Sequence, residues 1–122
     1  MLPQLKLDTA AVAEFLTGFI TKEIGKTGLS HAIIGLSGGV DSALSAALCA
    51  RALGAENVLC VLMPYRSSSP ESIEHAELVV RKLGVRRELV DITPMVDPLI
   101  ALEPEMDRLR RGNIMARQRM IV

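Results

Sequence analysis

The stretch His31-Ala-Ile-Ile-Gly-Leu-Ser-Gly-Gly-Val-Asp-Ser42 contains the most informative local pattern in this chain. Its first half is a short apolar run, which is typical of a buried strand, and its second half is a glycine-containing turn. The residues from Ala43 to Leu53 are mostly small and follow a helical pattern, which Gly54 ends. The stretch therefore predicts a strand, a tight loop and a helix in direct succession.

The same alternation continues toward the C-terminus. The apolar run Asn57 to Met63 predicts a second strand, and Glu71 to Leu83 carries apolar side chains at helical spacing. A third strand is expected from Arg87 to Ile92, followed by a helix around Met95 to Leu102. Apolar strands that alternate with helices are typical of βαβ units. We therefore predict an α/β fold, a doubly wound, Rossmann-like parallel sheet with helices on both faces.

The two ends of the chain extend this core. Apolar side chains from Asp8 to Ile24 recur at helical spacing, with Asp8 as the expected N-cap. We divide the chain into an N-terminal helix (1–29), a βαβαβα core (31–102) and a charged linker with the start of a further helix (103–122). The last helical pattern, Asn113 to Val122, stops in mid-course, so we expect a truncated domain.

Composition excludes several classes of partner. The 122 residues are 49% hydrophobic, with 14 basic and 14 acidic side chains, so no net charge attracts a nucleic acid. The longest apolar run, Val58 to Met63, has six residues, whereas a membrane span needs about 18, and no secretory segment is expected. Cys49 and Cys60 lack the spacing of a metal site or a disulfide framework. They are predicted to be core cysteines in a reducing compartment.

The turn after the first strand carries the chemistry that we expect. A tight loop between a parallel strand and a helix offers backbone N–H groups and the positive end of the helix dipole to an anion. Gly38 and Gly39 allow close approach of a phosphate, and Ser37 and Ser42 add hydroxyl donors. Asp41 would repel that phosphate unless a cation lies between them, so we predict that it binds Mg²⁺. The alternative is a simple turn in which Asp41 or Ser42 caps the helix.

Neither of two well-known phosphate loops fits this turn. A Walker A loop needs a lysine, and none occurs between Lys26 and Lys82. Ser37 stands where the dinucleotide pattern requires its second glycine.

The motif Ser37-Gly-Gly-Val-Asp-Ser42 instead resembles the SGGxDS pyrophosphate loop of the N-type ATP pyrophosphatases, which have the adenine nucleotide alpha hydrolase-like fold. These enzymes split ATP between its α- and β-phosphates. The resemblance implies that the backbone of Met63 contacts adenine, that Asp41 holds Mg²⁺, and that one continuous segment binds ATP: Gly35, Leu36, Ser37, Gly38, Gly39, Val40, Asp41 and Ser42.

The segment Arg111-Gly-Asn-Ile-Met-Ala-Arg-Gln-Arg-Met120 is similar to the GNxxARxRM segment of the NAD synthetases. The resemblance implies that Asn113 and Arg117 bind deamido-NAD, and four-residue spacing places both on one helix face. The alternative is a solvated cationic face, and for Arg119 both interpretations stay open. Arg66, in the polar loop 65–70, is equally open between contact with ATP and solvation. His31 and His75 are expected to be surface or structural residues.

The resemblance also implies a reaction. ATP and Mg²⁺ would activate the carboxylate of deamido-NAD as an adenylate, and ammonia would displace AMP to give NAD. The family implies a cytoplasmic homodimer, and this stretch alone is expected to be inactive. Two alternatives stay open: another N-type pyrophosphatase that resembles GMP synthetase, and a nucleotide-binding module without activity of its own.

Overall fold

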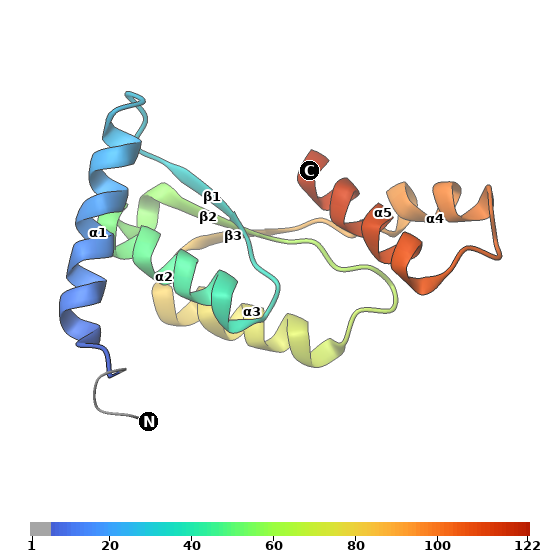
Figure 1. The fold of residues 1–122 in the computed structure, drawn as a ribbon, viewed down its shortest axis with the longest axis horizontal. Helices are drawn as coiled ribbons and strands as arrows, with labels where there is room; N and C mark the ends of the chain where they lie inside the picture. The colour runs from blue at the N-terminus through green and yellow to red at the C-terminus, as the bar shows by residue number, and fades with distance from the viewer. Residues whose placement is uncertain (1–5) are drawn as a thin grey trace.

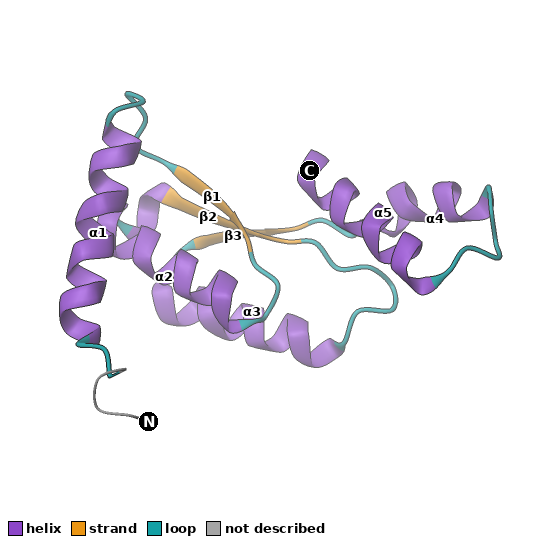
Figure 2. Cartoon of the chain, viewed as in Figure 1, coloured by secondary structure: helices purple, strands orange, loops and turns teal. Residues whose placement is uncertain are grey.

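The computed structural model describes residues 6–122 and contains a parallel sheet with flanking helices (Figures 1 and 2). The strands pair in the order β1-β2-β3, and Ile34 lies beside Cys60 in the register of the first pair. The predicted parallel α/β fold is therefore confirmed. In chain order the elements are α1 (Thr9–Gly25), β1 (Ala32–Gly35), α2 (Val40–Leu53), the 3-10 turn η2 (Ala55–Asn57), β2 (Val58–Leu62), α3 (Pro70–Leu83), β3 (Arg86–Leu89), α4 (Thr93–Ala101) and α5 (Arg108–Ile121).

Helices α2 and α3 both pack on one face of the sheet. Val58, Cys60 and Leu62 alternate along β2 and are buried against these helices, where Ala46 and Ala76 permit close approach. On the other face, Ile33 is 74% exposed. Helix α1 packs against α2. The prediction of helices on both faces of the sheet is thus wrong for residues 6–122, where the helices between the strands cover one face. Right-handed crossovers between strands in consecutive order place every crossover helix on the same side.

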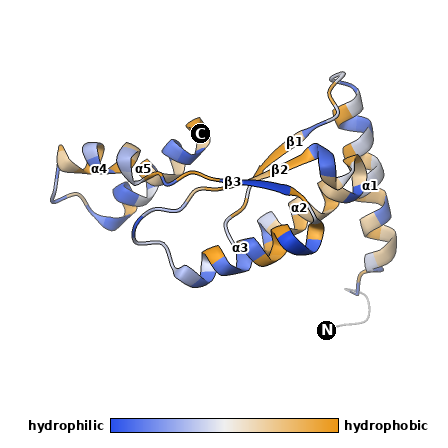
Figure 3. Cartoon of the chain, turned by 180° about the vertical axis from the view of Figure 1, so that it is seen from behind, coloured by the Kyte–Doolittle hydropathy of each residue, from blue (hydrophilic) through white to orange (hydrophobic). Residues whose placement is uncertain are grey.

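The third strand is hydrophilic and lies at the sheet edge (Figure 3). It is shorter than the predicted Arg87 to Ile92, because regular pairing ends at Leu89. Hydrogen bonds to the β2 side nevertheless continue from Val90 to the Leu62 carbonyl at 2.8 Å and from Ile92 to the Pro64 carbonyl at 2.9 Å. These bonds bring the start of α4 beside the end of β2.

In residues 6–122, no helix is sufficiently long and apolar to cross a membrane.

Helix capping explains where the outer helices begin. The predicted N-cap Asp8 is confirmed, since its side chain accepts a hydrogen bond from the N–H of Ala11 at 3.1 Å. Helix α5 begins at Arg108, five residues before the helical pattern predicted from Asn113. The Asp107 carboxylate accepts a hydrogen bond from the N–H of Arg110 at 2.8 Å, which starts the helix early. One glycine inside a helix costs only about 1 kcal/mol relative to alanine, so Gly112 does not end it.

Replacement of Asp107 by alanine is expected to lower the free energy of unfolding by about 1 kcal/mol, because the helix loses its cap. Urea unfolding followed by circular dichroism measures this change. Glu105→Ala is the matched control, since Glu105 is an exposed acid two residues away that lies outside the helix. Equal losses in both variants would contradict the capping role.

Candidate functional site

The loop between β1 and α2 requires glycine at one position. Gly38 has a φ of +88°, and a Cβ placed there would lie 3.0 Å from the Cα of Ser72 and overlap the Ser72 carbonyl oxygen. Gly39 is the N-cap of α2 and is extended, with no side chain bonded to the first turn. Neither Asp41 nor Ser42 therefore caps this helix, because Gly39 occupies the N-cap position. The N–H groups of the first turn are left without a side-chain acceptor.

Two serines hold the loop in this shape. The N–H of Ser37 donates to Ser42 Oγ at 3.1 Å, and the two hydroxyl oxygens are 3.0 Å apart. The N–H of Gly39 donates to Ser37 Oγ at 3.2 Å, and Ser42 Oγ donates to the Gly39 carbonyl at 3.3 Å. Both hydroxyls thus bond within the loop, and the backbone is preformed.

A cavity of about 360 Å³ opens at the carboxyl ends of β1 and β2. Its wall is formed by Gly35 at the end of β1, by Leu36 and Ser37 from the loop, and by Leu62 to Pro64 at the end of β2. Serines 68, 69 and 72, around the start of α3, face them with Arg119 from α5. The structure thus brings four of the predicted residues together in one cavity: Gly35, Leu36, Ser37 and Met63. Ligands of open parallel sheets bind at this edge.

The remaining loop residues lie next to this cavity rather than in its wall. Val40 and Asp41 are exposed in the first turn of α2. Residues 6–122 contain no group of three acidic, histidine or cysteine side chains that could enclose a metal ion. A lone carboxylate still suits Mg²⁺, which keeps several waters and binds through one or two carboxylates plus the phosphates of a substrate. Asp41 therefore fits a metal that arrives with a phosphate ligand.

The C-terminal residues divide between two faces of α5. Asn113 and Arg117 are exposed and do not line the cavity. Arg119 is half-buried, lines the cavity and donates from Nε to the carbonyl oxygen of Met63 at 3.0 Å. The sequence alone left Arg119 undecided. A signal was present, because Arg119 follows Met115 by four residues and so shares its face, and Met115 packs into the core.

Comparison with known proteins assigns the family. The family model described as NAD synthase matches residues 12–122. The chain belongs to the NAD synthase family. The NH(3)-dependent NAD(+) synthetase of Chlorobaculum tepidum is 51% identical over 122 aligned positions, which cover 99% of this chain and 44% of that protein. This NAD synthase family chain spans less than half the length of the curated relatives that it matches.

Solved structures agree with this assignment. The NH3-dependent NAD synthetase of Campylobacter jejuni, in complex with a nitrate ion, superposes with a TM-score of 0.87 at 33% identity, over 94% of this chain and 50% of that one. The glutamine-dependent NAD+ synthetase of Acinetobacter baumannii, in complex with ADP, gives a TM-score of 0.86 at 32% identity. That match covers 93% of this chain and 22% of the Acinetobacter chain.

In this NAD synthase family chain, Arg66 is held away from the cavity wall by α4. Its Nη1 pairs with Asp97 Oδ2 at 3.0 Å, and its guanidinium lies 5.5 Å from the centre of the Tyr65 ring. The Tyr65 hydroxyl donates to Asp97 Oδ1 at 2.6 Å. In the same loop, Ser68 and Ser69 line the cavity, whereas Arg66 pairs with Asp97. The network ties Tyr65 and Arg66, at the start of this loop, to α4.

This network predicts the ionisation of Tyr65, the only tyrosine in the chain. Its hydrogen bond to Asp97 raises the pKa of Tyr65 above its ordinary value, and the nearby Arg66 acts in the opposite direction. Absorbance titration of the phenol is expected to show a lower pKa in Asp97→Ala and a higher pKa in Arg66→Ala. Shifts of the same sign in both variants would contradict the network.

The raised pKa of Tyr65 also determines how this side chain contributes to the pH dependence of the free energy of unfolding. The folded state holds the phenol proton more tightly than the unfolded state, so this contribution is complete below pH 10 and is lost as pH rises through the folded pKa. Urea unfolding above pH 10 should therefore show a steeper loss of stability in the wild type than in Tyr65→Phe.

Proposed function

We propose that the polypeptide that carries these residues converts deamido-NAD to NAD with ammonia, and that it consumes ATP and releases AMP and pyrophosphate. The observation that carries the proposal is the match of 99% of this chain to a relative named as an NH(3)-dependent NAD(+) synthetase. The Acinetobacter relative that contains ADP supports an adenine nucleotide as the ligand of the cavity.

The proposed nucleotide site follows the geometry of the loop. The backbone N–H groups of residues 40–42, in the first turn of α2, bind the pyrophosphate end of ATP, because they place positive partial charges at one edge of the sheet. The base lies at the other end of the cavity against the backbone of Met63. Asp41 holds Mg²⁺, which neutralises charge on the phosphate oxygens when it is bound. Residues 31–102 are then the nucleotide-binding core.

The proposed reaction needs no nucleophile from the protein. A carboxylate oxygen of deamido-NAD attacks the α-phosphorus of ATP, and the bond to the leaving pyrophosphate breaks. Ammonia then attacks the acyl carbon, and AMP leaves as the amide forms. The chain contributes position and charge, since the loop orients the phosphates while Asn113 and Arg117 on α5 bind the anionic substrate. Arginine suits this task because its planar fork binds phosphate or carboxylate through two donors.

We further propose that this protein acts as a cytoplasmic homodimer. Large apolar side chains on the last helix are strongly exposed, with Leu109 at 74%, Met120 at 84% and Ile121 at 74%. Sedimentation velocity of the polypeptide that carries these residues, compared with its Met120→Glu variant, tests the dimer. A monomeric wild type contradicts it.

Two measurements test the function itself. Calorimetry of this chain with ATP and Mg²⁺ should detect binding, and the polypeptide that carries these residues should form NAD from deamido-NAD, ATP and ammonium. Xanthosine monophosphate is offered in parallel as the acceptor of a GMP synthetase. Amidation of xanthosine monophosphate without amidation of deamido-NAD would overturn the proposal, and so would the absence of ATP binding.

A further inference from the structure

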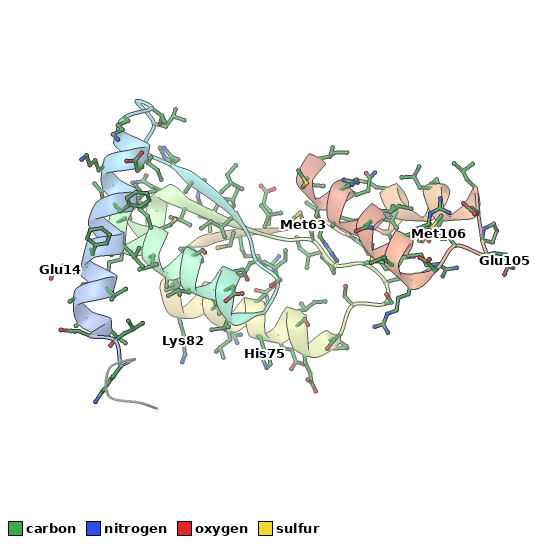
Figure 4. The ribbon with its side chains drawn as sticks, viewed as in Figure 1. Glu14, Met63, His75, Lys82, Glu105 and Met106 are labelled. Atoms are coloured by element: carbon green, nitrogen blue, oxygen red, sulfur yellow. The ribbon has the colours of Figure 1, made fainter. Side chains whose placement is uncertain are left out.

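Arg119 joins the last helix to the end of the central strand. Its Nε donates a hydrogen bond to the carbonyl oxygen of Met63 at 3.0 Å, across 56 residues of sequence, and the contact is partly buried. Met63 directly follows β2, and Figure 4 labels it where the sheet meets α5. Among residues 6–122, no other hydrogen bond links a side chain of α5 to β2 or to Met63.

Two other arginines of α5 remain near the segment that leads into that helix. Arg110 pairs with Glu103 at 2.6 Å, and Arg111 donates to the carbonyl oxygens of Met106 and Pro104. Of the described residues 6–122, Arg119 is the one that supplies a charged side chain to the wall of the cavity. Arg119 is therefore not part of a solvated cationic face. Its Nε donates to the Met63 carbonyl, which belongs to the end of the cavity where the base is proposed to bind.

The bond has a defined effect on that backbone. A carbonyl oxygen has two lone pairs, so Met63 can accept one hydrogen bond from Arg119 and a second one from a ligand. Because the hydrogen bond from Arg119 Nε holds the peptide between Met63 and Pro64 in one orientation, the second lone pair of the Met63 carbonyl has a fixed direction before a ligand binds. A base with an amino group donates to this lone pair, whereas the keto oxygen of another base is itself an acceptor and leaves the lone pair without a donor.

We propose that Arg119 is a positioning residue, which acts through the Met63 carbonyl to make the cavity prefer a nucleoside triphosphate whose base carries an amino group. The inference rests on the proposed function, because it takes the cavity to be the nucleotide site. It extends that function by assigning base selectivity to a side chain of the last helix.

Two substitutions separate the hydrogen bond from the charge and from the bulk of the side chain. In glutamine, Nε2 is as many bonds from Cα as Nε is in arginine, so Arg119→Gln keeps a donor near Met63 without the charge. The methionine side chain in Arg119→Met is as long as that of glutamine and has no hydrogen-bond donor. Calorimetry measures the affinities of ATP and of inosine triphosphate, in which a keto group replaces the amino group. We expect the wild type to prefer ATP about tenfold, as one hydrogen bond gives.

The expected pattern is specific to the proposed role. Arg119→Met should lose the preference and Arg119→Gln should keep most of it, while Arg110→Ala serves as a control on the same helix with wild-type selectivity. Thermal melts confirm that each variant is folded. A wild type that binds neither nucleotide contradicts the proposed function. If the wild type binds ATP but shows no preference over inosine triphosphate, only the role of Arg119 is contradicted. The same holds if Arg119→Met leaves the preference unchanged.

Discussion

Substitution of Gly38 by valine is expected to weaken ATP binding to this chain at least 100-fold. The backbone at Gly38 has a φ of +88°, which costs a residue with a side chain about 1–2 kcal/mol. A Cβ there would also overlap the backbone carbonyl of Ser72 at the start of α3. Because backbone rather than a flexible side chain is in the way, the loop must move. The N–H groups that face the phosphates would then lose their arrangement.

Gly39→Ala is the matched control in the same loop. Gly39 has a φ of −82°, and a Cβ there would lie 3.3 Å from the Ser37 hydroxyl, which can shift by a few tenths of an ångström. We expect less than a tenfold loss of ATP affinity in this variant, measured by calorimetry at saturating Mg²⁺. Near-ultraviolet circular dichroism and melting temperature establish that both variants are folded. Full affinity in a folded Gly38→Val variant would exclude the loop as the phosphate site.

Local pattern was sufficient to predict the strand order along the chain and the position of the loop. The apolar runs predict the first strand at 31–36 and the second at 57–63, and the structure has them at Ala32–Gly35 and Val58–Leu62. Such agreement arises because glycine and proline end elements by backbone geometry alone, which needs no tertiary information. The N-cap at Asp8 was predictable for the same reason, since capping is local.

Features that depend on packing were not predictable in this way. Apolar residues on both faces of a strand predict burial, yet Ile33 is exposed, because crossover handedness places α2 and α3 on one side. Helical spacing separates Arg117 from Arg119 but does not say which of the two faces the cavity. That choice depends on how α5 packs, where Ile114 and Met115 join the cluster around Ile92 and turn Arg119 toward β2.

Replacement of Asp41 by asparagine is expected to change ATP binding in opposite directions with and without Mg²⁺. With the metal present, the variant should bind ATP at least tenfold more weakly, because the carboxylate ligand is lost. Without the metal, it should bind ATP more tightly than the wild type, because the repulsion between a carboxylate and the triphosphate is removed. In the polypeptide that carries these residues, we expect NAD formation to fall about 100-fold, which corresponds to the loss of one strong electrostatic contact in the transition state.

The crossed pattern distinguishes a metal ligand from a residue that only contributes negative charge. Glu74→Gln makes the same change of net charge on α3, at an exposed position outside the cavity wall. If Asp41 acted only through its charge, both variants would bind ATP more tightly under every condition, and Mg²⁺ would not reverse the effect. If Asp41 instead only stabilised α2 through a favourable interaction with the helix dipole, Asp41→Asn would lower the melting temperature. The affinities for ATP with and without Mg²⁺ would then be unchanged. Calorimetry in Mg²⁺ and in EDTA separates these outcomes, because only a metal ligand gives effects of opposite sign in the two conditions.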